Sequence, residues 1–442
     1  MPLPEASATR LELLALVVAH VAMALAAFVD HGHYSLRGLG LLGLALAALA
    51  VAAWSATRPA PAASEPERPL VLGLLVLLLA GLTDEPGYDL RSAAYASAFF
   101  ALQASLAMAV ALAATRLRAD RLWRALFAAA VVTGFALRVG IVFASPFPRI
   151  DVFTQFQEAA AHLWSGLDPY REPIAETPGA GSFGYRVVAY SYPPAALYPM
   201  ALAWALLGDV RHAGIAAEAL AVAALYRIAR PAGPRVAQLL VLLLLFHPRG
   251  LYVIEQAWNE PLLVGAAAAF LYCAGRDPRS WRAPVSLGLF LSLKQYLVFF
   301  AFAALAARER RRWLLAVFSS ALATWLPFLL WDAGSAIDNG LLFQLRTDFR
   351  PDGLTLPSLL HAAFGWTPTK WMAVAVGSAV AGLAQRAFAG HGLGGLLYVG
   401  LLATSFAFFF GTQAFCNYFY FLGALSLFLI ALRLAAAVRG PR

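Results

Sequence analysis

Long apolar segments without alternation are the feature that most limits how this chain can fold. The sequence of 442 residues is 61% hydrophobic and only 13% charged. A soluble domain does not contain that proportion of apolar residues, so lipid is the solvent that the sequence indicates. In lipid the backbone groups of a segment must bond within that segment, and apolar runs without strand-like alternation therefore predict helices. We expect an all-α, polytopic integral membrane protein.

The apolar segments recur along the whole sequence and are separated by polar loops. Because the basic clusters between them do not let every segment be a full crossing, about 12–14 helical segments are predicted. They cover, approximately, residues 11–29, 38–56, 70–83, 93–115, 125–144, 193–207, 213–229, 236–246, 261–275, 283–306, 313–331, 354–365, 371–389, 394–410 and 418–437.

Arginine clusters mark many of the loops between these segments. The net charge of +9 therefore indicates the positive-inside pattern of cytoplasmic loops and no nucleic-acid partner. The stretches 236–275 and 283–306 each begin and end beside arginines, so each is expected to enter the membrane and return. Breaks are expected near Glu255–Glu260 and near Lys294. The clusters are Arg116/Arg118/Arg121/Arg124, Arg227/Arg230/Arg235, Arg276/Arg279/Arg282, Arg308/Arg310/Arg311/Arg312 and Arg433/Arg439/Arg442.

One polar connection, residues 145–192, is much longer than an ordinary loop, and counting the crossings places it on the extracytoplasmic side. Helical periodicity over residues 152–165 predicts an amphipathic helix on the membrane surface. Gly166 is expected to end this helix and Asp168 to begin a turn. The predicted apolar face holds Phe153, Phe156, Ala160, Leu163 and Trp164; Gln155, Gln157, Glu158 and His162 lie elsewhere.

Asp151 and Lys294 are the two charged residues whose positions most suggest chemistry. Asp151 follows a predicted span and precedes the amphipathic helix, so it is a candidate catalytic acid, a helix N-cap, or both. Lys294 interrupts an apolar run, where a cation is costly and is usually functional, although a snorkelling lysine is the alternative. Only two of the 33 basic residues are lysines.

Three polar clusters lie farther along the chain. Gln256, Asn259 and Glu260 stand in one predicted break, and Gln413, Asn417 and Tyr418 in another. Arg346, Asp348, Arg350 and Asp352 form a charged loop that fits an anionic ligand such as phosphate, or else a solvated surface. Arg138 and Glu218 lie inside apolar segments and are expected to pair with one another or with other buried polar groups.

Cysteines and histidines give no indication of a cofactor. Cys273 and Cys416 lie far apart in apolar surroundings and are expected to be packing residues, with neither a disulfide nor a metal between them. The histidines lack the spacing of metal ligands.

Several short motifs resemble the GT-C class of membrane glycosyltransferases, and their order is similar to the bacterial branch that uses polyprenyl-phosphate mannose (glycosyltransferase family 87). The resemblance covers about residues 120–430. It is carried by Asp151, Ala159-Ala160-Ala161, Leu163-Trp164-Ser165-Gly166-Leu167-Asp168-Pro169-Tyr170, Tyr190-Ser191-Tyr192-Pro193-Pro194, Glu255-Gln256-Ala257-Trp258-Asn259-Glu260-Pro261, Leu293-Lys294-Gln295-Tyr296 and Gln413-Ala414-Phe415-Cys416-Asn417-Tyr418.

The resemblance implies a GT-C-like fold with a large first extracytoplasmic loop that carries amphipathic helices. It implies transfer of a hexose, mannose above all, from a lipid phosphate to a lipid or glycan acceptor, with inversion and with Asp151 as general base. Many relatives carry paired acids at this position. Here Ile150 and Val152 flank the single acid, which favours a mechanism without metal. The setting would be a bacterial inner membrane.

Further residues are expected to bind the donor or the acceptor, and three parts of the chain are distinguished. The candidate binding residues are Arg149, Glu158, Asp168, Tyr170, Tyr192, Gln256, Asn259, Glu260, Lys294, Gln295, Arg346, Arg350, Asp352, Gln413, Asn417 and Tyr418. The parts are an accessory four-segment bundle (1–115), a catalytic core (116–353) and C-terminal transmembrane helices (354–442).

Two other functions share these features. A transporter or lipid flippase also has broken helices and buried charges, although no internal repeat stands out. A cell-surface glycan polymerase or ligase also combines many helices with one large outer loop, and Arg149, His162, Arg171 and Arg186 would serve it. The glycosyltransferase hypothesis requires Asp151, Lys294 and the 346–352 loop to face one cavity.

Overall fold

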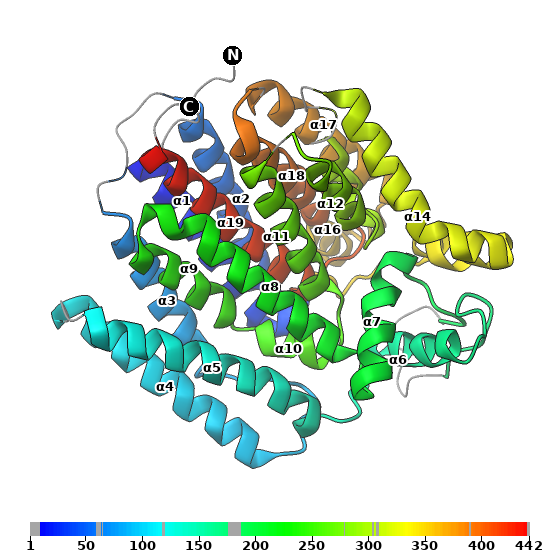
Figure 1. Cartoon of the computed structure of the whole chain (residues 1–442), viewed down its shortest axis with the longest axis horizontal. Coiled ribbons are helices and arrows are strands. Elements are labelled where there is room, and N and C mark those ends of the chain that lie inside the picture. Colours follow the sequence, from blue (N-terminus) through cyan, green and yellow to red (C-terminus); the bar gives the residue numbers. More distant parts are fainter. Residues whose placement is uncertain are drawn as a thin grey trace.

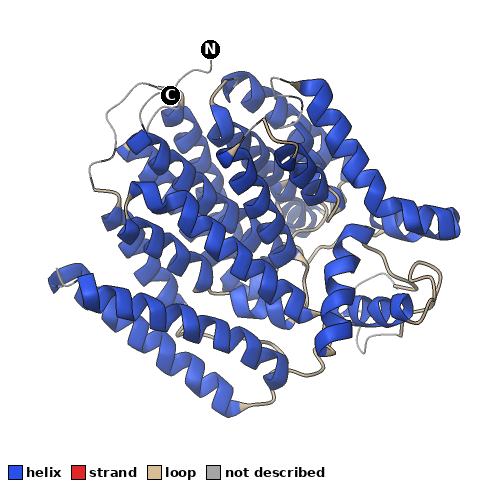
Figure 2. Cartoon of the chain, in the orientation of Figure 1, coloured by secondary structure: helices blue, strands red, loops and turns tan. Residues whose placement is uncertain are grey.

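The computed structural model describes residues 9–58, 63, 65–116, 120–175, 187–277, 279–302, 305, 309–388 and 390–439. Within these ranges every regular element is a helix, and the one isolated β-bridge joins His33 to Gly353 (Figure 2). Eight of the described helices are long and apolar enough to cross a membrane. The predicted all-α, polytopic class is therefore supported, whereas the GT-C-like character of the loop stays a prediction.

The helices follow one another with few long connections. In chain order they are α1 (Arg10–Phe28), η1 (Val29–Gly32), α2 (Leu36–Ala56), α3 (Glu67–Ala80), α4 (Ala93–Arg116), α5 (Asp120–Ala144), α6 (Asp151–Trp164), α7 (Pro194–Leu207), α8 (Arg211–Ala229), η3 (Arg230–Ala232), α9 (Pro234–Leu245), α10 (Gly250–Glu255), α11 (Glu260–Arg276), α12 (Arg282–Leu291), η4 (Gln295–Ala301), α14 (Arg310–Ile337), η5 (Asp338–Leu342), α15 (Phe343–Arg346), α16 (Leu356–Phe364), α17 (Lys370–Phe388), α18 (Gly392–Phe409) and α19 (Cys416–Arg439).

Most predicted segments coincide with these helices to within a few residues. Side-chain caps fix some of the starts: Thr9 accepts from the Glu12 N–H at 3.0 Å, and Ser35 accepts from the Gly38 N–H at 3.1 Å. One bound was wrong: the segment predicted over 283–306 stops as an α-helix at Leu291. α14 extends to Ile337, but its backbone leaves the helical conformation at Asp332 (φ −149°, ψ 91°), next to the predicted end at 331. The short helices α10 and α15 were not predicted.

The chain turns back in both stretches that were expected to return. Arg227, near the end of α8 and shortly before α9 begins, lies over the Tyr272 ring near the end of α11 (5.9 Å). The start of α9 is therefore near the end of α11, so the two helices run in opposite directions on either side of α10. Arg312 at the start of α14 donates to the carbonyl oxygen of Arg279, just before α12, so the chain has come back by residue 312. The breaks fall at residues 256–259 and 292–294, as predicted. Arg118, Arg308 and Arg442 of the predicted basic clusters lie outside the described residues.

The N-terminal helices pack directly on the later ones. α1 lies against α2 and α19, and α3 lies against α9, whereas the α4–α5 hairpin lies along the lower left edge of the molecule (Figure 1). Glu12 of α1 accepts from Arg433 of α19 (2.7 Å and 3.0 Å) and from the Tyr398 hydroxyl (2.8 Å). The proposed division of the chain at residue 115 stays a prediction, but residues 1–115 share the hydrophobic core with the rest.

The buried pair Arg138–Glu218 is present as expected. Arg138 Nε on α5 donates to Glu218 Oε2 on α8, and its Nη2 donates to the Leu245 carbonyl oxygen at 2.9 Å. The Tyr420 hydroxyl on α19 donates to the same carboxylate. Both charged side chains are 1% exposed, so this pair joins four helices, α5, α8, α9 and α19, inside the apolar core.

The helix directions define two ends of the bundle. One end, which we call the site end, carries His33, Asp84, Asp151 and the start of α19; Gly32 lies directly against Cys416 there. The other end carries Glu12 and Arg433. α6 and α7 lie together beside the site end, at the lower right of Figure 1.

Candidate functional site

Asp151 is the first residue of α6 and is only 9% exposed. The N-cap of α6 is Ile150, so the N-cap alternative for Asp151 does not hold. Its Oδ1 accepts from the Val152 N–H at 2.9 Å, and its Oδ2 accepts from Gln155 Nε2 at 3.5 Å. Gln155 lies one helical turn later on the same face, which is why it reaches the carboxylate.

Gln155 joins α6 to the end of the long loop. Its Oε1 accepts from Ser191 Oγ at 2.7 Å and from the Ser191 N–H at 3.3 Å. We had placed Gln155 off the buried face of α6, and that was wrong, because this side chain is 1% exposed. Trp164, which we had placed on the apolar face, is 58% exposed and donates its indole N–H to the Ala201 carbonyl oxygen at 2.8 Å.

Aromatic rings hold the loop segment 189–193 against α6. Phe156 stacks on Tyr192 at 5.1 Å and meets Tyr190 edge-on at 5.4 Å. The Tyr170 hydroxyl donates to the Tyr192 carbonyl oxygen at 2.8 Å. Gly166, with φ +73°, ends α6, and the Asp168 carboxylate accepts from the Tyr170 N–H at 2.9 Å, so the predicted turn is present.

Lys294 and Glu260 form the charged centre of the cluster. Lys294 Nζ lies 2.5 Å from Glu260 Oε1, which also accepts from the Tyr296 hydroxyl at 2.9 Å. The ammonium lies over three tyrosine rings, 5.6 Å from Tyr192, 5.1 Å from Tyr296 and 5.3 Å from Tyr418. Such contacts stabilise a desolvated cation. Asp151, Gln155, Ser191, Tyr192 and Lys294 therefore make one continuous series of contacts, which we call the central cluster.

The segment that follows α14 closes one side of the central cluster. Gln295 Nε2 donates to the Gly340 carbonyl oxygen at 2.9 Å, and Asn339 Nδ2 donates to the Tyr170 carbonyl oxygen at 2.8 Å. A Cβ atom at Gly340 would lie 2.7 Å from the Tyr170 ring, so the close approach of η5 to this tyrosine requires glycine.

Arg350 and Asp352 form a second group beside the central cluster. Arg350 donates to both carboxylate oxygens of Asp352 (2.7 Å and 2.6 Å) and lies over the Phe415 ring at 4.9 Å. His33 Nδ1 lies 3.4 Å from the same carboxylate, and the backbone of Gln413 lies against Gly353. Phe415 is three residues before Tyr418, so this group adjoins the central cluster through the start of α19.

Glu255 ties a loop of the N-terminal part to the break at residues 256–259. Its carboxylate accepts from the backbone N–H groups of Tyr88 (2.6 Å) and Asp89 (2.8 Å) and from Gln256 Nε2 (3.1 Å). Asp89 in turn accepts from the Arg149 N–H and from Arg149 Nε, both at 2.9 Å. Residues 88–89 thereby fix the chain two residues before Asp151.

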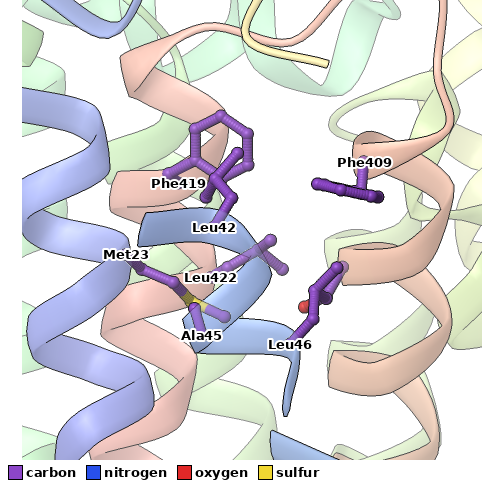
Figure 3. A pocket seen from close by; sticks show the side chains of 8 residues that line it. Met23, Leu42, Ala45, Leu46, Phe409, Phe419 and Leu422 are labelled. Carbon is purple, nitrogen blue, oxygen red and sulfur yellow. The ribbon is translucent and has the colours of Figure 1, made fainter. Parts of the chain in front are cut away.

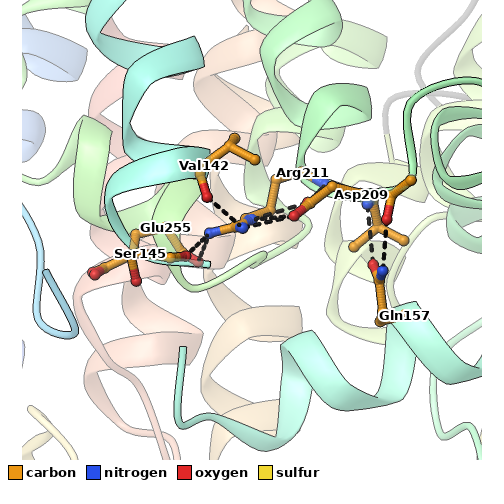
Figure 4. Close-up of polar contacts among 8 residues, drawn as sticks. Val142, Ser145, Gln157, Asp209, Arg211 and Glu255 are labelled. Atoms are coloured by element: carbon orange, nitrogen blue, oxygen red, sulfur yellow. Dashed lines mark hydrogen bonds and ion pairs between the residues drawn. The ribbon is translucent and has the colours of Figure 1, made fainter. Parts of the chain in front are cut away.

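Arg211, which the sequence did not single out, bonds to the segments that lead into Asp151 and into the break at residues 256–259. Figure 4 shows its guanidinium between the Asp209 carboxylate and backbone carbonyl groups of α5 and α10. It donates to the Ser145 carbonyl oxygen at 2.6 Å, to that of Val142 at 3.1 Å and to Asp209 Oδ2 at 2.6 Å. The guanidinium also lies 5.0 Å from the Phe153 ring, two residues after Asp151.

Burial and ion pairing shift three carboxyl groups that lie outside the candidate spans. Burial raises the pKa of Glu255 and that of Asp168 above their ordinary values. Burial also works to raise the pKa of Asp352, but the hydrogen bonds and charges of Arg350 and His33 outweigh it and hold that pKa well below its ordinary value. Asp352 is therefore ionised at neutral pH, which keeps the Arg350 pair in place.

The predicted site residues fall into three sets. The central cluster and the break beside it bring together Asp151, Asp168, Tyr170, Tyr192, Gln256, Asn259, Glu260, Lys294, Gln295, Asn417 and Tyr418. Arg350, Asp352 and Gln413 adjoin it. Arg149, Glu158 and Arg346 bind elsewhere, to Asp89, to the Ala175 N–H and to Asp338. Arg186 lies outside the described residues.

Arg346 is thus not brought to the central cluster, contrary to the requirement set for the 346–352 loop. Its side chain is 59% exposed and pairs with Asp338 within its own segment. Three residues that matter were absent from the predicted set: Gln155, Ser191 and Arg211. Only Gln155 had a usable signal, its position four residues after Asp151 on a helix.

Gly87 offers a test of the contact between the N-terminal part and Glu255. A Cβ atom at Gly87 would lie 2.9 Å from the Glu255 carboxyl carbon, so we expect Gly87→Ala to lower the free energy of unfolding by about 1–3 kcal/mol. Gly40→Ala is the matched control, since nothing lies within 4 Å of a Cβ atom there and alanine favours helix. Thermal unfolding of the two purified variants in one detergent measures the difference. Equal stability of the two would contradict the contact.

A small apolar pocket lies between α1, α2, α18 and α19. Met23, Leu42, Phe409 and Phe419 are among its lining residues (Figure 3), and its volume is ≈ 10 Å³. That is about the least space that holds one water molecule.

The described residues include no group of three His, Cys, Asp or Glu side chains placed to hold a metal ion. Cys273 is partly buried, Cys416 is fully buried, and neither forms a disulfide within the described part of the chain. No protein-family model, curated protein or solved structure matches this chain significantly.

Proposed function

We propose that this chain is a membrane glycosyltransferase that transfers a hexose from a polyprenyl-phosphate donor to a lipid or glycan acceptor, with Asp151 as the general base. The observation that carries the proposal is the convergence of Asp151 and Lys294. They come from α6 and from the break after α12, and Gln155, Ser191 and Tyr192 connect them at one end of the bundle. A carboxylate and a cation in one cluster are what a displacement on a lipid phosphate needs.

In this mechanism Asp151 takes the proton of the acceptor hydroxyl as its oxygen attacks the anomeric carbon. The new carbon–oxygen bond forms while the bond from that carbon to the phosphate oxygen breaks. The lipid phosphate leaves with the electron pair, and the single displacement inverts the anomeric centre. A base positioned in this way contributes about 10²–10⁴-fold to a rate.

Cations in and beside the cluster would stabilise the negative charge that develops on the leaving phosphate. An ammonium has three N–H donors, of which Glu260 takes one from Lys294. Arg350, which lies over the Phe415 ring next to the start of α19, is a second positive charge beside the cluster. The lipid tail would lie along the apolar outer surfaces of α7 and α14, where Leu202, Leu206 and Phe318 are exposed.

The test is transfer by the purified chain in lipid vesicles. Vesicles receive radiolabelled polyprenyl-phosphate mannose and a panel of acceptor lipids, with and without EDTA. We expect a labelled glycolipid whose formation needs both the chain and the donor and does not respond to EDTA. Movement of the labelled donor between leaflets without transfer would contradict the proposal in favour of a flippase. Transfer only of a preassembled glycan would contradict it in favour of a ligase.

A further inference from the structure

Two neighbouring side chains at the start of α11 carry acceptor oxygens that no hydrogen bond satisfies. Asn259 Oδ1 and Glu260 Oε2 are buried and have no hydrogen-bond partner among the described residues. The two residues are 1% and 0% exposed. Buried oxygens of this kind are nearly always bonded in folded proteins, so two adjacent ones need an explanation.

Both side chains contact the central cluster through their other polar atom. The other oxygen of Glu260 holds Lys294 and Tyr296, and Asn259 Nδ2 donates to the carbonyl oxygen of Leu293, the residue before Lys294. Asn259 is the N-cap residue of α11, yet its side chain makes no capping bond. Ala257, two residues before Asn259, has φ +54°, a costly conformation for a residue with a Cβ atom. A strained turn thus leads into Asn259 and Glu260 at the start of α11.

A third unsatisfied acceptor lies at the neighbouring helix start. Asn417 Oδ1 on α19 is buried without a partner among the described residues, one residue before Tyr418, whose ring lies over Lys294. Tyr296 and Tyr418 are partly exposed, so the cluster reaches the molecular surface at these two rings.

The chemistry of these atoms selects the ligand. All three are acceptors, so their complement is a group that brings several hydrogen-bond donors. A phosphate brings acceptors and does not fit. The Lys294 ammonium already lies 2.5 Å from the Glu260 carboxylate. A metal cation bound to the same carboxylate would lie next to this ammonium, and two positive charges so close together repel strongly. Neutral hydroxyl groups meet the requirement, and the tyrosine rings give the site the mixed apolar and polar lining of small-molecule sites.

We propose that Asn259 and Glu260 bind the hydroxyl groups of the transferred sugar, with Asn417 as a further acceptor. The inference rests on the proposed function and assigns the polyhydroxylated part of the donor to the start of α11. Lys294 then has a second role: it pairs with Glu260 Oε1 and so leaves Oε2 to the sugar. Asn259 and Glu260 are thereby separated from Asp151, which acts on the acceptor.

The experiment compares two lipids that differ only in the sugar. Equilibrium binding of decaprenyl-phosphate mannose and of decaprenyl phosphate is measured with detergent-purified wild type, Asn259→Leu and Thr404→Val. Leucine has the same number of side-chain heavy atoms as asparagine and removes the acceptor, together with the long bond from Nδ2 to the Leu293 carbonyl oxygen (3.4 Å). Thr404→Val is the matched control, because the Thr404 hydroxyl is also buried without a partner but lies within α18.

We expect Asn259→Leu to weaken binding of the mannosyl lipid about tenfold and to leave binding of decaprenyl phosphate unchanged, as expected for one lost hydrogen bond. Thr404→Val should change neither. An equal loss for both lipids, or no loss for either, would overturn the inference. A thermal stabilisation by NaCl over choline chloride that Asn259→Leu abolishes would overturn it in favour of a cation site.

The same data separate this inference from the proposed function. Sugar-dependent binding that needs Asn259, without any transfer, would refute the transferase and keep the sugar site. Transfer that survives with full affinity in Asn259→Leu would keep the transferase and refute the sugar site. A wild type that binds neither lipid would refute both.

Discussion

Asp151→Asn is expected to reduce sugar transfer about 10²–10⁴-fold, because it removes the base. The long hydrogen bond from Gln155 Nε2 to Asp151 Oδ2 (3.5 Å) is lost with it. Asparagine has the shape of aspartate, and its Oδ1 can still accept from the Val152 N–H, which Asp151 binds at 2.9 Å. The start of α6 should therefore keep its geometry. The initial rate of transfer from polyprenyl-phosphate mannose into acceptor lipid measures the effect, and donor binding should be unchanged.

A second acid of the same loop serves as the control. Glu172→Gln is the matched substitution, because it removes the charge and keeps the size of the side chain. Glu172 follows the Asp168 turn and belongs to none of the clusters described above. We expect it to transfer at the wild-type rate. If the Asp151→Asn protein transfers as fast as Glu172→Gln, Asp151 is not the base and the proposed mechanism is wrong.

Arg138→Met is expected to lower the free energy of unfolding by about 3–5 kcal/mol. The substitution leaves the Glu218 carboxylate buried among α5, α8 and α19 without its cation, while the Tyr420 hydroxyl still donates to it. An unpaired charge in an apolar core is far more costly than the loss of the pair itself. Unfolding in mixed detergent micelles, followed by circular dichroism, measures the loss.

The double variant Arg138→Met/Glu218→Gln distinguishes the unpaired charge from lost packing. It removes both charges and lets the Tyr420 hydroxyl donate to an amide oxygen, so we expect it to regain much of the lost stability. Arg37→Met, at an exposed arginine, should change stability by less than about 0.5 kcal/mol. A double variant as unstable as the single one would show that packing, not the unpaired carboxylate, is the cause.

The positions of the helices were predictable because hydrophobic patterning acts locally. The start of α6 next to Asp151, the stop at Gly166 and the breaks at 256–259 and 292–294 all follow from residue types within one or two turns. The expected partners of Arg138 and Glu218 also followed, since two opposite charges in apolar segments have few other ways to be buried.

Contacts between distant segments were not predictable in the same way. Arg346 and Arg350 stand four residues apart with the same charge, yet one pairs with Asp338 at the surface and the other adjoins the central cluster beside Phe415. Gln155 looked like a surface residue of α6 until its two partners, Asp151 and Ser191, were seen on either side of it. Helical periodicity gives the face of a side chain but not what covers that face.

Local residue patterns indicated lipid as the solvent and predicted the order and approximate bounds of the helices and the places where they break, because each depends on apolar runs and their interruptions. The packing of the helices was needed to show that Glu260 pairs with Lys294, that Glu255 accepts hydrogen bonds from a loop of the N-terminal part and that Asn259 keeps an unsatisfied oxygen. These contacts join residues far apart in the chain. Such residues meet only when whole helices have packed, and no local preference of either residue encodes the meeting.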